Sequence, residues 1–304
     1  MEFWRIANNK IVQASITNKL GFDVNGEYLI APDEYIADGK FIILRTCHGI
    51  GDWVMVEPIA KNLKMKYPNS KVYVASPQMI NDIFGFLHQR GWWGSWGDPS
   101  KTVEYMFKNN PYIDGYVDEW HTEVYHDHFR IYDSTNPKIT LAQQMLKFHH
   151  MNYDECTNLN PMIYFDDGEI KIGDGHLKNL PNDFEFLHIS DRYTNNDTNI
   201  LLTYIDELGL SGKKFITYFK GDISQTEFSK LNIAGNIINI EDPRIQFYVK
   251  SKANNVIGVQ TGATDVVSGL TQVHSLHHQS SLEETWGVGN YIPNIKYINR
   301  FDYL

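Results

Sequence analysis

The sequence contains little cysteine, no long apolar run and no compact cluster of basic residues. Its two cysteines, Cys47 and Cys156, lie far apart and lack CxxC spacing, so neither a disulfide framework nor a zinc site is expected and a reducing compartment is the simpler interpretation. No apolar run approaches the ~20 residues of a membrane span. The first residues also lack the apolar core of a signal peptide. We therefore expect a cytoplasmic protein with at most peripheral membrane contact.

Positive charge is not concentrated in any one segment of the chain. The formal net charge is −10, and lysines and arginines are scattered along the chain. Duplex nucleic acid requires a broad basic face. This distribution argues against a broad binding surface for duplex nucleic acid, but it does not exclude a narrow local one.

The motifs of several enzyme classes are absent. There is no GxSxG elbow, no GxxxxGK[ST] phosphate loop and no HExxH metal motif. The turn CHGIGD, residues 47–52, does not complete the GxGxxG dinucleotide pattern. The histidines lack metal-ligand spacing with a third ligand in view, so no metal site is predicted.

The run from Phe41 to Ser76 is the most informative part of the chain. A short apolar strand at 41–44 is followed by a glycine turn, an amphipathic segment, Pro68 and a second apolar strand at 71–75. This order predicts a β-strand, an α-helix and a second, parallel strand. In open α/β sheets, ligands bind at the strand-to-helix corner.

That corner contains His48, Gly49, Gly51 and Asp52. Glycines allow a tight turn and close approach of the backbone to a ligand, and a helix start offers free N–H groups. Asp52 is either a helix N-cap or a catalytic group, and local sequence alone favours the cap. Pro58 predicts that the regular helix starts late, which leaves Asp52 on an exposed corner.

The second half of the chain repeats the alternation of strands and helices. Strands are predicted at 184–189, 214–219, 236–240 and 255–259, with helices at 200–208 and 245–253 and another beginning over 266–270. Such alternation predicts a parallel, doubly wound sheet. We expect two Rossmann-like domains facing a cleft, residues 1–165 with a small N-terminal extension and residues 166–304.

Two further segments are predicted from turn signals. A hairpin is expected between strands at 10–13 and 27–30, around Asn25-Gly26. Gly168, Gly173 and Gly175, followed by Pro181, predict an irregular patch near the domain boundary.

Polar residues follow the predicted strands of the second half. Hydroxyl groups and exposed N–H groups at a helix start suit phosphate oxygens, and arginine can neutralise a diphosphate. For each group the alternative is structural, as a helix cap or a surface ion pair. With Gly49 and Gly51 of the first corner, the candidate donor-binding residues are Ser190, Arg192, Lys220, Thr261, Gly262, Thr264 and Asp265.

A Trp/Gly stretch at 91–97 is too aromatic for an idle loop. It is either a loop folded on its own small core or a wall on which a sugar stacks. Trp93 and Trp96, with His48, are the candidate acceptor-binding residues.

Taken together, these patterns resemble the family 9 glycosyltransferases, which include the bacterial ADP-heptose lipopolysaccharide heptosyltransferases. Residues 42–63 are similar to the family's opening strand, LGD turn and helix with an early proline. Residues 68–72 are similar to its entry to the second strand, and 109–114 to its approach to a following strand. Residues 256–262, VIGVQTG, resemble its hxhxDTG signature.

The resemblance implies a GT-B fold with the active site between the two domains. It implies inverting, metal-independent transfer of a sugar from a nucleotide-diphosphate sugar, without a cofactor. Asp52 matches the general base of the family, while Thr261 and Gly262, with Ser190 and Arg192, would hold the diphosphate. The N-terminal domain would bind the acceptor and the C-terminal domain the donor.

The sequence also departs from the family. Gln260 replaces the usual aspartate, Asp265 stands where histidine is common, and residues 85–100 have no counterpart. These departures leave the donor and acceptor open. A phage-type enzyme that glycosylates DNA or a modified base is one alternative, which the Asn-, Lys- and Tyr-rich composition suits. A non-catalytic module that binds a nucleotide or glycan is another.

Overall fold

The computed structural model of the chain describes residues 2–7, 10–15, 39–44, 54, 56–75, 104–117, 126–127, 142–143, 146, 150–188, 195–218, 237–277 and 292–303. These residues form two compact units. The first contains those up to Pro161 together with Ile292 and Pro293, and the second contains the rest. The division therefore falls at Pro161, while the sequence-based boundary falls after residue 165. The acceptor and donor roles assigned to the two domains stay predictions.

The first unit contains the predicted β-α-β unit. Strand β3 (Lys40–Leu44) leads to helix α3 (Val56–Lys66) and then to strand β4 (Lys71–Ala75). Strands β5 (Gly115–Val117) and β6 (His126–Asp127) complete a parallel sheet in the order β5-β4-β3-β6. The parallel pairing of β3 with β4 confirms the prediction for this segment.

The apolar face of α3 forms the core of this unit. Pro58 is the third residue of α3 within these bounds. Val54 is also helical, and the residues on either side of it lie outside the described ranges, so the late helix start stays a prediction. The fully buried core residues here are Phe41, Ile43, Val56, Ile59, Ala60, Leu63, Val72 and Val74.

The N-terminal hairpin differs from the predicted one. Strand β1 (Glu2–Ala7) pairs antiparallel with β2 (Lys10–Ser15), so that Ala7 lies opposite Lys10. The partner of the predicted strand at 10–13 is therefore the segment before it, because a two-residue connection closes a hairpin at small entropic cost. Residues 27–30 lie outside the described residues.

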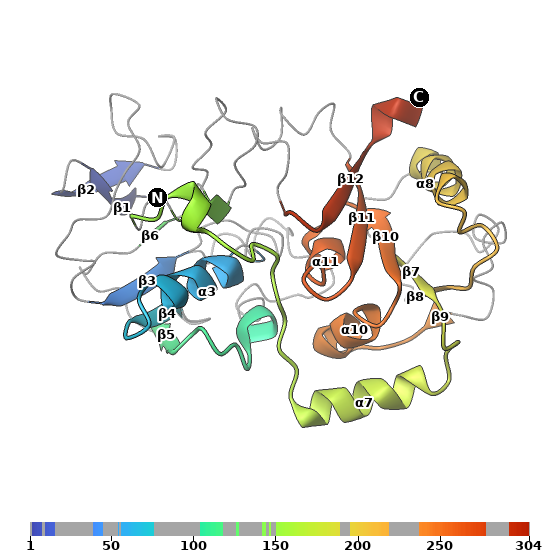
Figure 1. Cartoon of the computed structure of the whole chain (residues 1–304), viewed down its shortest axis with the longest axis horizontal. Helices are drawn as coiled ribbons and strands as arrows, with labels where there is room; N and C mark the ends of the chain where they lie inside the picture. The colour runs from blue at the N-terminus through green and yellow to red at the C-terminus, as the bar shows by residue number, and fades with distance from the viewer. Residues whose placement is uncertain are drawn as a thin grey trace. The chain divides into compact units, whose positions relative to one another are not determined.

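The second unit is a six-stranded parallel sheet. Its strands are β7 (Glu185–His188), β8 (Phe215–Tyr218), β9 (Ile237–Ile238), β10 (Asn255–Val259), β11 (Gln272–His277) and β12 (Ile295–Asn299). They lie in the order β9-β8-β7-β10-β11-β12 (Figure 1). Numbered along the chain within this unit, that order is 3-2-1-4-5-6, the strand order of dinucleotide-binding folds. The sheet predicted for this half is confirmed.

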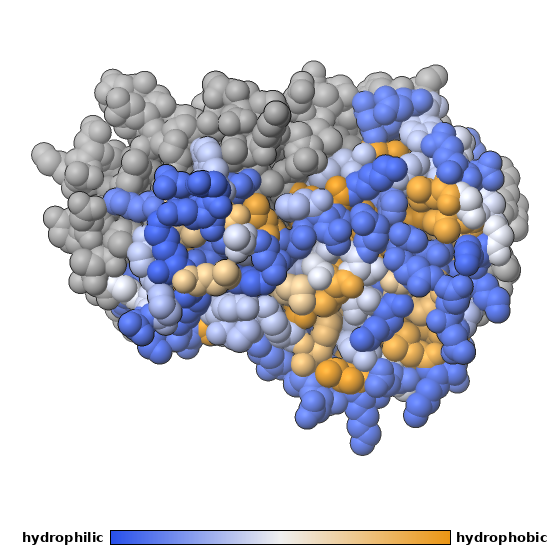
Figure 2. Space-filling view, in the orientation of Figure 1, coloured by the Kyte–Doolittle hydropathy of each residue, from blue (hydrophilic) through white to orange (hydrophobic). Residues whose placement is uncertain are grey.

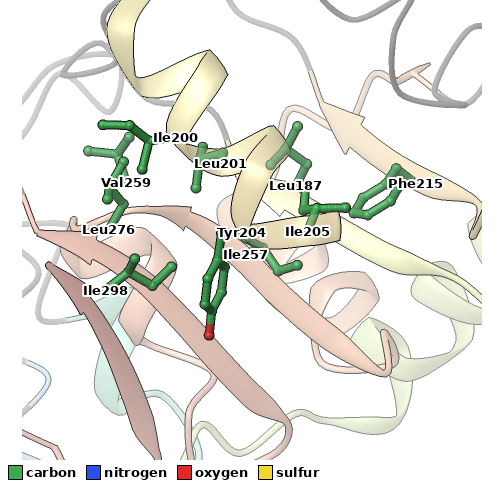
Figure 3. Packing of buried hydrophobic residues seen from close by; sticks show 10 residues of the cluster. All are labelled: Leu187, Ile200, Leu201, Tyr204, Ile205, Phe215, Ile257, Val259, Leu276 and Ile298. Carbon is green, nitrogen blue, oxygen red and sulfur yellow. The ribbon is translucent and has the colours of Figure 1, made fainter. Parts of the chain in front are cut away.

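Helices cover both faces of this sheet. Helix α8 (Asn195–Glu207) packs on one face, and its apolar side chains point toward the strands (Figure 3). Helix α10 (Pro243–Lys250) lies on the other, with Lys250 over the ring of Phe186. The cluster under α8 contains Leu187, Ile200, Leu201, Tyr204, Ile205, Phe215, Ile257, Val259, Leu276 and Ile298.

The segment predicted to be irregular around Gly168 is a helix, α7 (Asp167–Leu177). Asp166 caps it: its side chain accepts from the Glu169 N–H at 2.8 Å, and Glu169 in turn accepts from the Asp166 N–H at 2.9 Å. This capping box starts a helix despite glycines in its interior. A Cβ on Gly173 would lie 2.1 Å from Cδ1 of Tyr248, so α7 packs against α10 only because residue 173 has no side chain (Figure 1).

Other boundaries also differ from prediction. The helix expected over 266–270 is the short α11 (Gly262–Asp265), and residues 266–270 form turns. Strands β11 and β12 were not predicted, because polar residues interrupt their apolar pattern. Residues 142, 143 and 146 are also helical.

Two short 3-10 helices, η3 (Tyr153–Glu155) and η4 (Arg300–Tyr303), complete the described elements. None of the helices in the described ranges is long and apolar enough to cross a bilayer. On the face seen in Figure 2, apolar residues form several separate areas among hydrophilic ones.

Candidate functional site

Strands β7 and β10 lie side by side at the centre of the second sheet, although four described elements separate them in the sequence. From β7 the chain continues to β8 on one side, and from β10 to β11 on the other. Such a topological switch point leaves a crevice outside the carboxyl ends of the two strands, where open α/β sheets bind ligands. The candidate site is therefore the edge formed by His188, the last residue of β7, and Val259, the last of β10.

The two strands approach closely at this edge. Gly258 of β10 lies opposite His188 of β7. A Cβ on Gly258 would lie 2.6 Å from the His188 carbonyl oxygen, which is closer than any side chain tolerates. Glycine at position 258 thus sets the spacing of the strands that frame the site.

The predicted Thr261-Gly262 pair follows β10 directly at this edge. Both residues are partly exposed. Thr261 is the N-cap of α11, and its hydroxyl oxygen accepts from the Thr264 N–H at 3.2 Å. Thr261 is therefore a helix cap, which is the structural alternative predicted from the sequence. The first N–H groups of any helix have no partner earlier in that helix.

Thr264 and Asp265 serve the interior of the domain. Thr264 is 0% exposed and donates its hydroxyl to the Val259 carbonyl at 2.8 Å. Asp265 is 2% exposed, and its carboxylate accepts from the Ser275 hydroxyl at 3.1 Å. Their described side-chain contacts hold α11 against the strand ends. The donor-binding role predicted for these two residues stays a prediction.

A buried lysine that the sequence analysis did not single out lies beneath the same edge. Lys250 of α10 is 0% exposed. Its Nζ lies 3.1 Å from Nδ1 of His188. Sequence reasoning places lysines at the surface. The available signal was its position directly after Phe247, Tyr248 and Val249, all of which are buried.

The pKa values of this cluster depart from their ordinary range. Burial lowers the pKa of Lys250 to about 7, and the charge of Asp265 partly offsets that effect. Burial raises the pKa of Asp265 to about 7, against the hydrogen bond from Ser275 and the charge of Lys250. Burial, then the charge of Lys250, lowers the pKa of His188 well below its usual value. The imidazole is therefore neutral at pH 7.

The other predicted site residues lie outside the described residues. Ser190 and Arg192 come two and four residues after His188 in the sequence, and the donor-binding roles predicted for them stay predictions. The remaining predicted residues outside the described ranges are His48, Gly49, Gly51, Asp52, Trp93, Trp96 and Lys220.

The first sheet has a switch point of its own. Strand β3 has β4 on one side and β6 on the other, and the turn with Asp52 comes after β3 in the sequence. In the parts of the chain that the structure describes, no three His, Cys, Asp or Glu side chains gather at one point.

No protein-family model and no curated protein matches the sequence. Among solved structures, the chain matches the glycosyl transferase family 9 from Veillonella parvula DSM 2008 with a TM-score of 0.53 and 10% identity, covering 87% of each chain.

The chain has the fold of a family 9 glycosyltransferase. The resemblance inferred from the sequence motifs is thus confirmed for the fold, which is the predicted GT-B class of two Rossmann-like units. The E. coli ADP-heptose lps heptosyltransferase II also matches, with a TM-score of 0.46, 11% identity and coverage of 85% of this chain and 90% of that one. An E. coli heptosyltransferase with ADP-2-deoxy-2-fluoro heptose matches with a TM-score of 0.41, 11% identity and coverage of 86% and 93%.

Proposed function

We propose that this chain is a glycosyltransferase that moves a sugar from a nucleotide-diphosphate sugar to an acceptor hydroxyl. One observation carries the proposal. In a chain with the family 9 fold, the segment that sequence analysis predicts to bind the diphosphate follows β10 at the switch point of the second sheet. Ligands of such sheets bind at this position.

The predicted chemistry is inverting and needs no metal. The acceptor oxygen attacks the anomeric carbon as the bond to the diphosphate breaks. The leaving group then carries the negative charge. Donors fixed beforehand at that position stabilise the transition state more than flexible ones would. Thr261 and Gly262, with Ser190, Arg192 and Lys220, are the groups proposed for this task.

Asp52 is the proposed general base. A carboxylate on an exposed corner can take the proton of the acceptor hydroxyl during attack. What supports this proposal is the strand order, because β3, after which Asp52 comes in the sequence, is the strand at a second switch point. The acceptor is a glycan or another hydroxyl-bearing molecule, with His48, Trp93 and Trp96 as the proposed contacts.

The donor class is tested first by thermal shift with the ADP, UDP, GDP and CMP series and their sugars. A ligand at about 100 times its Kd stabilises a protein by ~2.7 kcal/mol. We expect a selective response to one nucleotide diphosphate. No response to any of them, with dinucleotides as controls, would remove the nucleotide-sugar proposal.

The role of Asp52 is tested with two substitutions that keep a helix cap. Asn and Ser both cap helices well, but neither acts as a base. We expect D52N and D52S to lower transfer by about 10²–10⁴-fold, with thermal stability and donor binding retained within a few fold. Near-normal transfer by either variant would exclude Asp52 as the general base and leave it only the role of a helix N-cap. Donor binding without turnover on any acceptor, glycan or DNA, would favour the non-catalytic module.

A further inference from the structure

Gln260 follows the last residue of β10 and points its side chain away from α8. Its backbone N–H donates to the Leu276 carbonyl at 2.8 Å, so the pairing of β10 with β11 continues through this residue. Successive side chains along a strand point to opposite faces of the sheet. Val259 packs under α8 (Figure 3). Gln260 therefore points to the other face, at the carboxyl edge.

On that face, Gln260 is the side chain of β10 nearest to the switch point. Gly258 lies opposite His188 of β7, and residues 258 and 260 share a face because side chains along a strand alternate. Residue 258 has no side chain. The first side chain of β10 that this face presents beside the end of β7 is therefore that of Gln260.

The carboxamide of Gln260 is enclosed but has no hydrogen-bond partner. The residue is 6% exposed. Neither its amide nitrogen nor its amide oxygen forms a hydrogen bond in the part of the chain that the structure describes. Fully buried polar atoms without a partner do occur in this unit, as in the Ser268 hydroxyl, but the amide atoms of Gln260 are not among them. The carboxamide therefore still reaches the surface of the edge.

The polar side chains that follow Gln260 are already engaged. The hydroxyls of Thr261 and Thr264 lie 3.1 Å apart and share a hydrogen bond. Asp265 accepts from the Ser275 hydroxyl. Most enclosed side-chain polar groups have a partner, since one without a partner loses the free energy of its hydration. A carboxamide left open at the edge where such sheets bind ligands points to a partner that arrives with the ligand.

The chemistry of a carboxamide defines what that partner must offer. The amide oxygen accepts and the amide nitrogen donates. A phosphate oxygen only accepts, so it would satisfy the nitrogen and leave the amide oxygen facing negative charge. The aspartate usual in the family pattern could only accept from a ligand. A pair of neighbouring hydroxyl groups satisfies both amide atoms together, because one hydroxyl donates while the other accepts.

We propose that Gln260 determines donor specificity by binding two neighbouring hydroxyl groups of the nucleotide sugar, accepting from one and donating to the other. This inference rests on the proposed function, because it takes the ligand at this edge to be a nucleotide sugar. Neighbouring hydroxyls occur both on the sugar and on the ribose, on either side of the diphosphate. The proposed diphosphate partners, Thr261 and Gly262, follow Gln260 directly in the sequence.

The experiment measures ligand affinity of the intact chain and of Q260M by calorimetry. Methionine keeps the length of the side chain and removes both hydrogen-bonding atoms without adding charge. The probes are ADP-glucose, UDP-glucose and GDP-mannose, each beside ADP, UDP or GDP alone. We expect Q260M to bind the nucleotide sugar about tenfold more weakly than wild type. The Tm of the free chain should stay equal or rise, because the polar group removed has no partner there.

Two further variants test the donor function of the amide and the position of the contact. Q260E keeps the shape and the acceptor but loses the N–H donor, so we expect it to bind the nucleotide sugar at least as weakly as Q260M. Q272M is the matched control. Gln272 is the first residue of β11, at the opposite edge of the sheet, and its Nε2 donates to the Asn294 carbonyl at 3.1 Å. Q272M should lower the Tm and keep wild-type affinity.

The outcomes separate this inference from the proposed function. Weaker binding of the nucleotide sugar alone supports it and assigns the hydroxyl pair to the sugar, whereas equal weakening of the nucleotide diphosphate supports it and assigns the pair to the ribose. Wild-type affinity in Q260M or in Q260E overturns the inference and leaves the proposed function in place. If Q260M does not fold, Q260E decides alone. Failure of every probe to bind the wild-type chain overturns both proposals.

Discussion

At the scale of single residues, surroundings decide what the same amino acid contributes. Gly173 and Gly175 both lie inside α7. A Cβ at position 173 would meet the Tyr248 ring, whereas nothing lies within 4 Å of a Cβ at position 175. Glycine inside a helix costs stability in proportion to its backbone freedom. Only at position 173 does close packing, here against Tyr248, offset that loss of stability.

The two glycines therefore give opposite predictions. We expect G173A to lower the free energy of unfolding by about 1–3 kcal/mol, because the added methyl group overpacks the contact with Tyr248. We expect G175A to raise it by up to about 1 kcal/mol through helix propensity. Urea unfolding of both variants against wild type measures the difference. Equal effects of the two alanines would contradict the packing account of Gly173.

Asp114 predicts a dependence of stability on acid pH. Burial alone would raise its pKa, but hydrogen bonds from Lys64, the Val72 N–H and Lys71 outweigh it and hold that pKa at about 2. The Nζ atoms of Lys64 and Lys71 lie 2.5 Å and 3.0 Å from its carboxylate. Because the folded pKa is lower than the unfolded one, the stabilisation is complete above about pH 4 and disappears as the pH falls toward 2.

The measurement compares wild type with D114N across that range. We expect D114N to be about 1 kcal/mol less stable at pH 7, a figure reduced for solvent screening near the surface. The difference should shrink as the pH falls through 2 and vanish only below it, where both side chains are uncharged. A difference that persists unchanged at pH 2 would mean that shape, not charge, explains the role of Asp114.

At the scale of elements, α7 depends on α10 for its position. Arg244 of α10 binds Glu169 of α7 with Nε 2.6 Å from Oε1, and the side chains are 4% and 9% exposed. Arg244 also donates to the Tyr164 carbonyl and lies over the Phe165 ring. One arginine therefore fixes both the first turn of α7 and the segment that leads into it.

Removing one partner of this ion pair should cost more than removing both. We expect R244M to destabilise the chain by about 3–5 kcal/mol, because it leaves the Glu169 carboxylate buried without its cation. The double variant R244M/E169Q should recover part of that loss, since no unpaired charge remains. A double-mutant cycle by denaturant unfolding measures the coupling. Strict additivity of the two single effects would exclude the buried-charge explanation.

At the scale of the whole molecule, the second unit contains every described residue of the candidate donor site. The sheet order, the helices on its faces and the Lys250 cluster all lie within residues 162–304. A domain of this size can fold alone when it contains its own hydrophobic core. All residues of the cluster under α8 belong to this unit.

A fragment of residues 162–304 should therefore fold and bind the donor without transferring sugar. We expect cooperative unfolding and affinity for the same nucleotide sugar within a few fold of the intact chain. Transfer should be absent, because Asp52 is in the other domain. Circular dichroism, calorimetry and a transfer assay check the three statements. An unfolded fragment would show that the second unit depends on the first.

The sequence by itself determined the class of fold, because the central strands of a parallel sheet are buried on both faces and appear as apolar runs, as in 41–44 and 256–259. It also located Thr261-Gly262 after such a strand, since the end of an apolar run marks the end of the strand. Strands β11 and β12 were missed because polar residues such as His274 and Lys296 interrupt their runs.

Tertiary structure decided the properties that depend on distant partners. Glycines predict irregular chain by propensity, and α7 is a helix because its capping box and the Tyr248 contact outweigh that propensity. Lys250 is buried because α10 and β7 enclose its side chain, and its pKa follows from that burial. A local sequence pattern reflects only interactions between residues that are close along the chain. Burial, charge coupling and strand order arise only when distant segments pack together.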